Sequence, residues 1–298
     1  MNFKVAVIIV NWKKYDFTLK CIESVLNSSF NNFKIILIDN EHQKGVFDEL
    51  EKNEKIHIIK NKNNEGFSKA NNLGIKYSIK TGFDYVLLLN NDTVIKNDLI
   101  YLLIKQSTKF NQKIIQPLIL NYDGTKIWNG GGIINNFFGT FKTIKKGESF
   151  KNLKSNKNFT EWFTGCCVLI KSDVFDAVGF FDERFFAYYE DIDFSIRLKE
   201  HGYSIAMMND SYLLHFESAS SKSINQKEGN LLPYVHYLNI RNHIFLLKKH
   251  SKSFNILGIV LFQSIKIFSY LLYFLIRLRF NKFNMVIKGF ADALNFKK

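Results

Sequence analysis

Three polar side chains follow the short apolar segment Tyr85–Leu89, whose composition predicts a buried strand. They are Asn90, Asn91 and Asp92. At the carboxyl end of a buried strand, one aspartate can hold a hard divalent cation against a diphosphate group. Because Asn and Asp are also ordinary turn formers, this fragment alone is compatible with a simple turn as well as with a metal site.

A second candidate centre is the acidic pair Glu190 and Asp191, at the start of a helix predicted over Glu190–His201. The aromatic segment Phe185–Tyr189 precedes the pair, and large rings would shield Asp191 from bulk water while it stays ionised. A general base needs that environment. Carboxylates in a first helical turn are also stabilised by the helix dipole, so a capped surface helix is the alternative.

Other polar residues lie where ligands bind in sheets with parallel strands. His215 follows an apolar segment and is either a ligand or a structural hydrogen-bonding residue. Asp39 ends another predicted strand, where it either caps a turn or accepts hydrogen bonds from a base or ribose. The segment Asn63–Phe67 predicts a turn, and Asn71 fits a helix surface.

The elements that must position these residues alternate between strand and helix, which predicts an α/β fold with a mostly parallel sheet and helices on both faces. Ligands bind such sheets at the carboxyl ends of the strands. Buried strands are predicted at Val5–Val10, Lys34–Asp39, Ile56–Lys60, Tyr85–Leu89, Ile114–Leu120 and Glu161–Lys171, and helices at Asp16–Leu26, Gly45–Lys52, Ser68–Lys80, Asn97–Phe110, Ser172–Val178 and Glu190–His201.

Two common nucleotide-binding loops are absent from the sequence. The first predicted strand continues into Asn11–Lys14 without a glycine, and neither G-x-G-x-x-G nor G-x-x-x-x-G-K-[ST] occurs. This excludes the usual dinucleotide oxidoreductases and P-loop NTPases. The 3 cysteines are too few for a disulfide framework, so we expect reduced thiols in a cytosolic protein.

The order of the motifs resembles one protein family. VIIVNW, an Asp ending the next strand, NEGFSKANNLGI, LLLNNDT, the long segment from TGCCVLIK to EDIDFSIRLKEHGY and a following His occur in that order. Together they resemble the family 2 glycosyltransferases of the GT-A fold, and most closely their bacterial rhamnosyltransferase-like branch. The resemblance covers roughly residues 4–220.

The resemblance implies a nucleotide pocket. Asn11 and Asp39 match the family's positions for the base and the ribose. The remaining residues that the resemblance places on this side of the pocket are Gly66, Phe67, Asn71 and Asn91.

The resemblance also implies a metal site and a catalytic base. Asp92 matches the last acid of the family's D-x-D motif, which here reads Asn90-Asn91-Asp92 and keeps one carboxylate. His215 matches a histidine that completes the metal site in some relatives, and the cofactor is then Mg²⁺ or Mn²⁺. Asp191 matches the catalytic base, and Glu190 precedes it in the motif.

The implied activity is a metal-dependent, inverting hexosyl transfer from a nucleotide-diphosphate sugar. The branch suggests dTDP-L-rhamnose, with a UDP-hexose as the other donor, and a lipid-linked or polysaccharide acceptor in cell-surface glycan assembly. A non-catalytic nucleotide-binding or nucleic-acid-binding protein is the alternative from another class. Transfer assays with nucleotide sugars distinguish the two.

Positive charge is concentrated in the last part of the chain. The formal charge is +14, and residues 241–298 contribute +10 of it through 8 Lys, 3 Arg and one acid. Since the remainder is nearly neutral, we expect no nucleic-acid partner for the main domain. We therefore predict a catalytic domain over residues 1–230 and a basic, apolar helical region over residues 231–298.

The segment Asn255–Ile276 is long enough to cross a bilayer, but Lys266 lies in its middle. Three interpretations compete: a spanning helix, a helix in the membrane interface, and a helix packed on protein. The central lysine and the cationic flanks favour the interfacial helix on an anionic leaflet. The short run Val5–Val10 does not form a signal peptide, so we expect a peripheral protein at the cytoplasmic face of the cell membrane.

Overall fold

The computed structural model of the chain describes residues 2–40, 45–152, 159–216 and 231–296. The chain divides into two compact units. The first comprises Met1–Ile133, Thr143–Phe186 and Glu190–Glu217, and the second comprises Ile134–Lys142, Ala187–Tyr189 and Ser218–Lys298. Each unit is described by itself.

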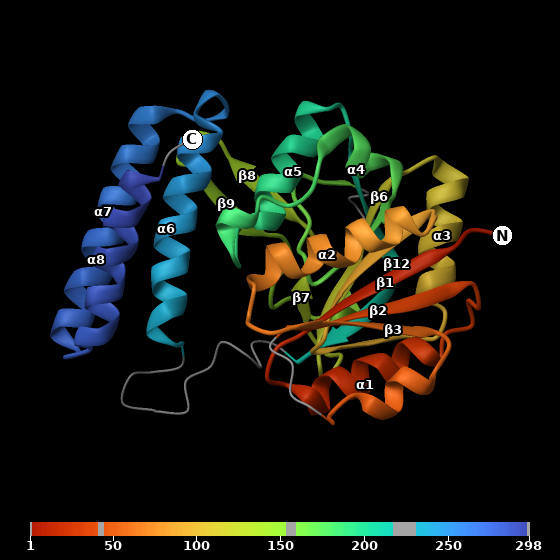
Figure 1. Cartoon of the computed structure of the whole chain (residues 1–298). Helices are drawn as coiled ribbons and strands as arrows, with labels where there is room; N and C mark the ends of the chain where they lie inside the picture. Colours follow the sequence, from red (N-terminus) through yellow and green to blue (C-terminus); the bar gives the residue numbers. More distant parts are fainter. Residues whose placement is uncertain (1, 41–44, 153–158, 217–230, 297–298) are drawn as a thin grey trace. The chain divides into compact units, whose positions relative to one another are not determined.

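A sheet of ten strands forms the centre of the first unit (Figure 1). Its main path runs β10-β12-β6-β11-β4-β1-β2-β3, while β5 pairs with β12 and β7 pairs with β6. The β3, β2, β1 and β4 strands are mutually parallel, and β11 runs antiparallel to β4 and β6. The strands are β1 (Val5–Asn11), β2 (Phe33–Asn40), β3 (Ile56–Asn61), β4 (Tyr85–Asn90), β5 (Thr93–Ile95), β6 (Ile114–Asn121), β7 (Ile127–Asn129), β10 (Phe159–Thr160), β11 (Cys167–Lys171) and β12 (Ile205–His215).

Helices cover both faces of this sheet, because the buried strands are apolar on both sides. Val7 and Ile9 of β1 belong to the same core cluster as α1 and α3, whereas Ala6 and Ile8 belong to that of α2, α4 and α5. The fold predicted from the sequence is therefore confirmed. The helices are α1 (Tyr15–Leu26), α2 (Gly66–Lys80), α3 (Leu99–Phe110), α4 (Asp173–Val178) and α5 (Glu190–Glu200), with 3₁₀ turns η1 (Asp48–Lys52), η2 (Phe150–Asn152) and η3 (Glu183–Phe185).

Two predicted elements are shorter than the sequence suggests. The helix expected at Gly45–Lys52 is only the 3₁₀ turn Asp48–Lys52. The strand expected at Glu161–Lys171 begins at Cys167. Its first half is irregular because side chains accept three consecutive backbone N–H groups: Phe163 N donates to Ser195 Oγ, Thr164 N to Gln116 Oε1 and Gly165 N to Asp191 Oδ2.

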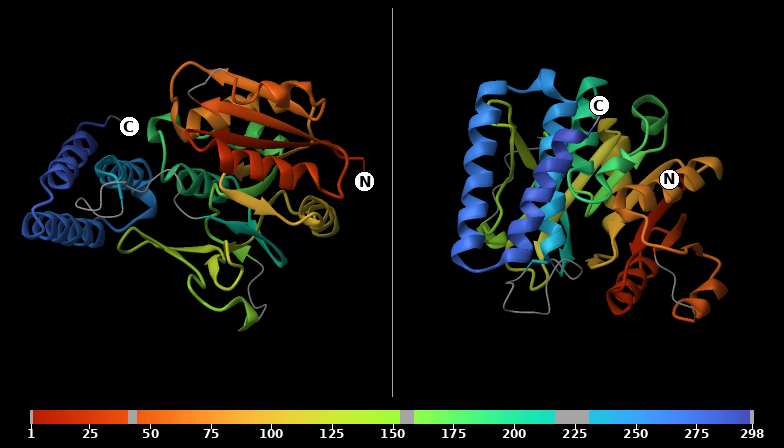
Figure 2. Two further views of the ribbon diagram at one scale, coloured as in Figure 1. Left: turned by 90° about the horizontal axis from the view of Figure 1, so that it is seen from below. Right: turned by 60° about the vertical axis from the view of Figure 1, so that its left-hand side comes forward.

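The second unit contains the region after Leu231 that was expected to be helical, and its described residues form three α-helices, drawn in blue in Figure 2. They are α6 (Pro233–Lys249), α7 (Ile256–Ile276) and α8 (Phe280–Asn295), with the 3₁₀ turn η5 (Ser251–Ser253) after α6. Ile240, Phe274 and Val286 lie in their shared core. The unit also contains most of the hairpin β8 (Gly132–Asn135) and β9 (Thr140–Thr143).

The domain boundary predicted after residue 230 stays a prediction, since residues 217–230 lie outside the described part of the chain. The second unit takes in the whole predicted C-terminal region 231–298. It also takes in the three residues Ala187–Tyr189, which directly precede Glu190.

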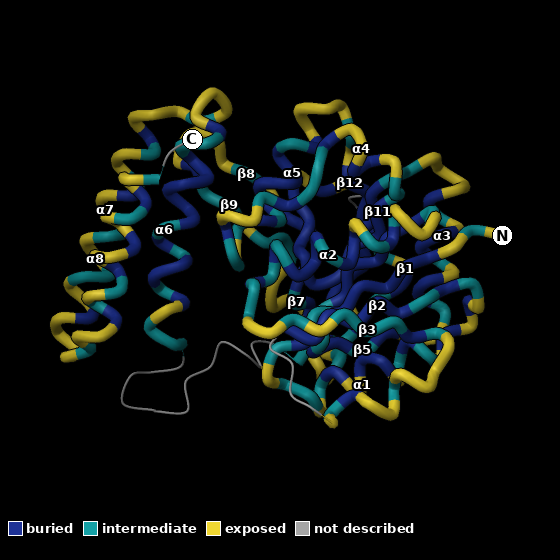
Figure 3. Tube along the Cα trace, viewed as in Figure 1, coloured by how far each residue is buried: buried dark blue, intermediate teal, exposed yellow. Residues whose placement is uncertain are grey.

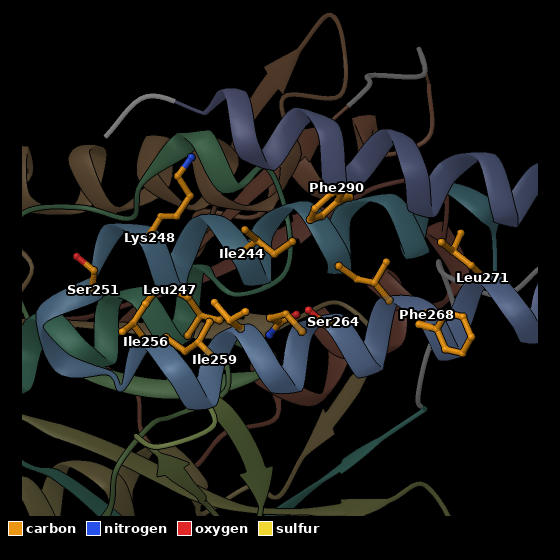
Figure 4. A pocket seen from close by; sticks show the side chains of 13 residues that line it. Ile244, Leu247, Lys248, Ser251, Ile256, Ile259, Ser264, Phe268, Leu271 and Phe290 are labelled. Atoms are coloured by element: carbon orange, nitrogen blue, oxygen red, sulfur yellow. The ribbon is translucent and has the colours of Figure 1, made fainter.

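The α7 helix leaves much of its apolar surface exposed, as the yellow segments of Figure 3 show. By length and composition it could cross a membrane. Within the second unit, an apolar cavity of about 750 Å³ lies between the helices, and Ile244 of α6, Ile259 of α7 and Phe290 of α8 line it (Figure 4). Lys266 of α7 is not an isolated charge, because its Nζ lies 2.8 Å from His243 Nδ1. Burial lowers the pKa of Lys266 to about 8.

Candidate active site

The carboxyl edge of the parallel strands collects the polar residues that the sequence singled out. Asn11 ends β1 and stands opposite Asp39 of β2, while Asn90 ends β4 beside β1. The chain goes from β1 to β2 through α1 on one face, and returns to β4 through α2 on the other. The gap between β1 and β4 is thus the switch point at which α/β sheets bind ligands.

A chain of hydrogen bonds runs along this edge. Asn91 Nδ2 donates to Thr18 Oγ1 at 2.8 Å, Thr18 Oγ1 to Asn11 Oδ1 at 2.7 Å, and Asn11 Nδ2 to Asp39 Oδ1 at 3.0 Å. The predicted residues Asn11, Asp39 and Asn91 are therefore brought together. Thr18 of α1 is the residue that sequence reasoning missed. Its signal was a hydroxyl residue on the buried, apolar face of that helix.

Gly66 and its neighbours are joined to the same edge through β2. Asn40 Nδ2 donates to Asn64 Oδ1 at 2.8 Å and approaches the Gly66 carbonyl at 3.4 Å. Gly66 has a φ of 82°, and a Cβ there would lie 2.5 Å from Phe186 Cδ2. Only glycine fits this close approach at the start of α2.

Phe67 and Asn71 have different surroundings. The Phe67 ring packs on Gly165, where an added Cβ would lie 3.1 Å from the ring. Asn71 is buried, and its Nδ2 donates to the Phe67 carbonyl within α2 at 2.9 Å. Phe67 thus lies beside the predicted base, because the Gly165 N–H donates to Asp191 Oδ2.

Asp191 is held in a defined place at the start of α5. Its Oδ2 accepts from Gly165 N at 3.1 Å and its Oδ1 from Ile192 N at 2.9 Å. Burial raises the pKa of Asp191 to about 6, although both backbone bonds favour the ionised form. The carboxylate is therefore a stronger base than an exposed aspartate.

Glu190 is more deeply buried than Asp191. Its Oε2 has no hydrogen-bond partner among the described residues. Burial, and secondarily the charge of Asp191, raises the pKa of Glu190 well above its ordinary value. The raised pKa favours the protonated form of Glu190.

Asp92 and His215 meet at the other side of the edge. His215 ends β12 opposite Thr93 of β5, and this register brings its Nε2 to 3.2 Å from Asp92 Oδ1. The His215 ring packs edge-on against Trp128, and its buried Nδ1 has no hydrogen-bond partner in the described part of the chain. The residues predicted for the metal site are thus adjacent.

This pair fits a divalent cation whose other ligands come from elsewhere. Within the described ranges, no cluster of three or more His, Cys, Asp or Glu side chains could hold a metal by itself. A carboxylate oxygen and an imidazole nitrogen suit Mn²⁺, and Mg²⁺ is commonly held by one carboxylate together with substrate phosphates and water.

The two acidic centres are both linked to one short backbone segment, Gly165–Cys166. Gly165 N binds Asp191, and the next residue, Cys166, accepts from Asn90 N at 2.8 Å, two residues before Asp92. Burial raises the pKa of the Cys166 thiol, and the charges of Asp92 and Asp191 raise it further. The buried thiol therefore lies within electrostatic reach of both carboxylates.

The architecture of this sheet, with its polar carboxyl edge, is that of the glycosyltransferases of the GT-A fold. Residues 6–179, more than half of the chain, match the family described as glycosyl transferase family 2, and the protein belongs to that family.

Relatives in sequence support the rhamnosyltransferase-like branch. dTDP-rhamnosyl transferase RfbF of Shigella flexneri is 26% identical over 254 residues, which cover 84% of this chain and 82% of the relative. Low-salt glycan biosynthesis hexosyltransferase Agl10 of Haloferax volcanii is 28% identical over 240 residues, covering 80% of this chain and 73% of the relative. The resemblance predicted from the sequence is thereby confirmed.

Solved structures show the same fold. GalNAc-T7 with UDP, GalNAc and Mn²⁺ superposes with a TM-score of 0.63 at 17% identity, over 83% of this chain and 48% of that one. Staphylococcus aureus TarS in complex with UDP-GlcNAc gives a TM-score of 0.54 at 14% identity, over 82% of this chain and 66% of that one. The chain thus spans about half the length of the first of these structures.

Proposed function

We propose that this glycosyltransferase moves one sugar, with inversion, from a nucleotide diphosphate to a lipid-linked glycan during the assembly of a cell-surface polysaccharide. The observation that carries the proposal is that two acidic centres, Asp92 with His215 and Asp191, both lie near the Gly165–Cys166 segment, since the charges of Asp92 and Asp191 both raise the pKa of the Cys166 thiol. Asp92 with His215 is suited to hold a cation against the departing diphosphate, and Asp191 is suited to accept the proton of the incoming hydroxyl.

Asp191 takes the role of the general base. Its ionised oxygen accepts the proton of the acceptor hydroxyl as that oxygen bonds to the anomeric carbon and the nucleotide diphosphate leaves with the electrons of the broken bond. One base acting opposite the leaving group gives a single displacement, and hence inversion. Because burial raises the pKa of Asp191 to about 6, the base combines ionisation at neutral pH with proton affinity.

Asp92 and His215 would hold Mg²⁺ or Mn²⁺. When bound, the cation would neutralise charge that develops on the diphosphate. The Asp92 carboxylate and His215 Nε2 face each other at 3.2 Å, and Trp128 fixes the histidine ring. The hydrogen-bonded chain from Asn91 through Thr18 and Asn11 to Asp39 would orient the nucleoside.

The donor that we propose is dTDP-L-rhamnose. Relatives named dTDP-rhamnosyl transferase and rhamnosyltransferase match most of the chain, which supports this choice over a UDP-hexose. A lipid-linked acceptor fits the exposed apolar face of α7 with its cationic flanks, which would bind an anionic membrane surface from the cytoplasmic side.

The test is a panel of dTDP-L-rhamnose and UDP-hexoses with Mn²⁺, assayed by thermal shift and by release of the nucleotide diphosphate with a lipid-linked acceptor. We expect dTDP-L-rhamnose to raise the melting temperature most, since a ligand stabilises the folded state in proportion to its affinity. If the enzyme turns over only a UDP-hexose, the donor is that UDP-hexose and not dTDP-L-rhamnose. Binding without turnover of any nucleotide sugar would favour a non-catalytic nucleotide-binding protein.

A further inference from the structure

The segment Ala187–Tyr189 directly precedes the acidic pair and has an unusual backbone. Tyr188 and Tyr189 have φ values of 70° and 73°, and Phe186 before them has a φ of 61°. Aromatic side chains rarely adopt this left-handed region, and such outliers persist only where surrounding contacts impose them. The contacts that impose this backbone come from α6.

Asn242 of α6 supplies the main contact. It is completely buried, and its Nδ2 donates to the Ala187 carbonyl at 2.7 Å and to the Tyr188 carbonyl at 2.9 Å. Its Oδ1 accepts from Arg241 Nε at 2.8 Å. Since a guanidinium can only donate, this bond fixes which end of the carboxamide faces the two carbonyls.

The next residue of α6, His243, holds the end of the same segment. Its imidazole stacks on the Tyr189 ring, with the centroids 5.0 Å apart and the planes at 19°. Its Nε2 lies 2.7 Å from the Gly139 carbonyl oxygen, and its Nδ1 lies 2.8 Å from Lys266 Nζ. The ring therefore has little freedom to move away from Tyr189.

We propose that Asn242 and His243 are positioning residues for the transfer reaction. They hold Ala187–Tyr189 in its strained form, and the peptide bond after Tyr189 leads straight into Glu190 and Asp191 at the start of α5. The contacts of α6 thus restrain the backbone that leads into the base. This inference rests on the proposed function of Asp191.

The chemistry of the side chain makes the requirement specific. Two backbone carbonyls side by side need two N–H donors from one short side chain, and a carboxamide provides them. An aspartate of the same shape would turn oxygen atoms toward both carbonyls. Asn239, one turn earlier on α6, offers a matched control because its Nδ2 donates to the Val235 carbonyl of its own helix.

The experiment compares Asn242→Ala, Asn242→Asp and Asn239→Ala in the full chain, with a soluble acceptor. For both Asn242 variants we expect kcat to fall by about tenfold or more, while donor KM and donor affinity change by about twofold or less. The Asn239→Ala enzyme should behave like the wild type. The variants must melt within a few degrees of the wild type to be compared.

The pH profile separates positioning from general damage. Release of the segment should expose Asp191 to water, so the acid limb of kcat should move to lower pH in the Asn242 variants. A uniform loss with an unchanged profile would overturn the proposal, and so would equal kcat in all variants. Loss of folding in both Asn242 variants, with Asn239→Ala folded, would overturn it too, by making the contact structural.

Different results would contradict the proposed function and this positioning inference. If wild-type protein transfers no sugar, or if Asp191→Asn is fully active, the base assignment is wrong. If wild type is active and Asp191→Asn is not, but the Asn242 variants match Asn239→Ala, the positioning assignment alone is wrong.

Discussion

The strand edge of the first unit buries polar side chains, whereas the α7 helix of the second unit exposes apolar ones. At the edge, Asp39, Asn11 and Thr18 are almost completely buried and bonded to one another. On α7, Leu257 is 77% exposed and Phe268 66%. Buried polar groups and exposed apolar patches are the two informative departures from a simple core.

We infer that the strand edge and the α7 helix have different tasks. A buried polar network is costly unless every member is paired, so it is kept where a fixed geometry is required, as at a reaction centre. An exposed apolar face is stable only if something else covers it, such as a lipid surface. We therefore expect changes at the edge to alter chemistry and changes on α7 to alter location.

The largest effect is expected from Asp191→Asn. The amide has the same shape but cannot take a proton, so transfer should fall by about 10³-fold while donor affinity is retained. Single-turnover rates and donor titration measure the two. Because each Asp191 oxygen accepts a backbone N–H and an amide nitrogen cannot accept, we expect a small decrease in the melting temperature.

Glu190→Gln is the matched control for that substitution. Burial raises the pKa of Glu190 well above its ordinary value, which favours the neutral acid, and glutamine is a neutral side chain of the same shape. Transfer should stay within about tenfold of wild type. Equal losses for the two variants would argue that the pair acts as one structural unit.

Asp92→Ala should come next, with donor affinity reduced by about 100-fold and the response to added Mn²⁺ removed. Asp92 is the only carboxylate in its motif, and His215→Ala should show the same defect to a smaller degree. The readouts are nucleotide-diphosphate binding and EDTA sensitivity. Asp176→Ala, an exposed acid on α4, is the control. Full wild-type activity in EDTA would exclude the metal.

The pH dependence should show an acid limb. Below a pH of about 6 the Asp191 carboxylate takes up a proton, so kcat should fall about tenfold per pH unit. The direction follows from the raised pKa, since the active form is the ionised one. A rate that is flat from pH 5 to 8 would be incompatible with this base.

Thr18→Val should have a moderate effect at the same edge. It keeps the shape but leaves Asn11 Oδ1 and Asn91 Nδ2 without this partner, at a cost of about 1–3 kcal/mol in stability. Donor KM should rise by about fivefold, with kcat nearly unchanged. Thr108→Val, on the exposed face of α3, should alter neither quantity. An unchanged donor KM in Thr18→Val would show that this hydrogen-bonded network does not contribute to nucleotide binding.

The smallest effect on chemistry is expected on α7. Leu257→Asp with Leu261→Asp should weaken sedimentation with anionic liposomes by about tenfold and leave transfer to a soluble acceptor unchanged. High salt should weaken, without abolishing, the binding of wild type, because it screens charge but not apolar burial. Leu19→Asp, on α1, is the surface control. If the wild-type protein does not sediment with anionic liposomes, another protein surface covers α7.

The sequence by itself determined the strands, the helices and the edge at which the polar residues gather. Short apolar runs and helical spacing are local signals, and parallel strands bring their carboxyl ends together whatever the details of packing. The resemblance of the motifs then grouped Asn11, Asp39 and Asn91 in one nucleotide pocket before the structure was known. The resemblance of the motifs added the family and the roles of Asp92, Asp191 and His215.

Only the tertiary structure decided contacts between residues far apart in the sequence. The 3.2 Å between Asp92 and His215 depends on the pairing of β5 with β12, and the irregular stretch before Cys167 depends on acceptors from α5 and β6. Asn242 lies 55 residues from Ala187, and nothing in its helical pattern marks it as different from Asn239. Local propensity acts over one or two turns, whereas a buried amide finds its partners only once the whole chain has packed.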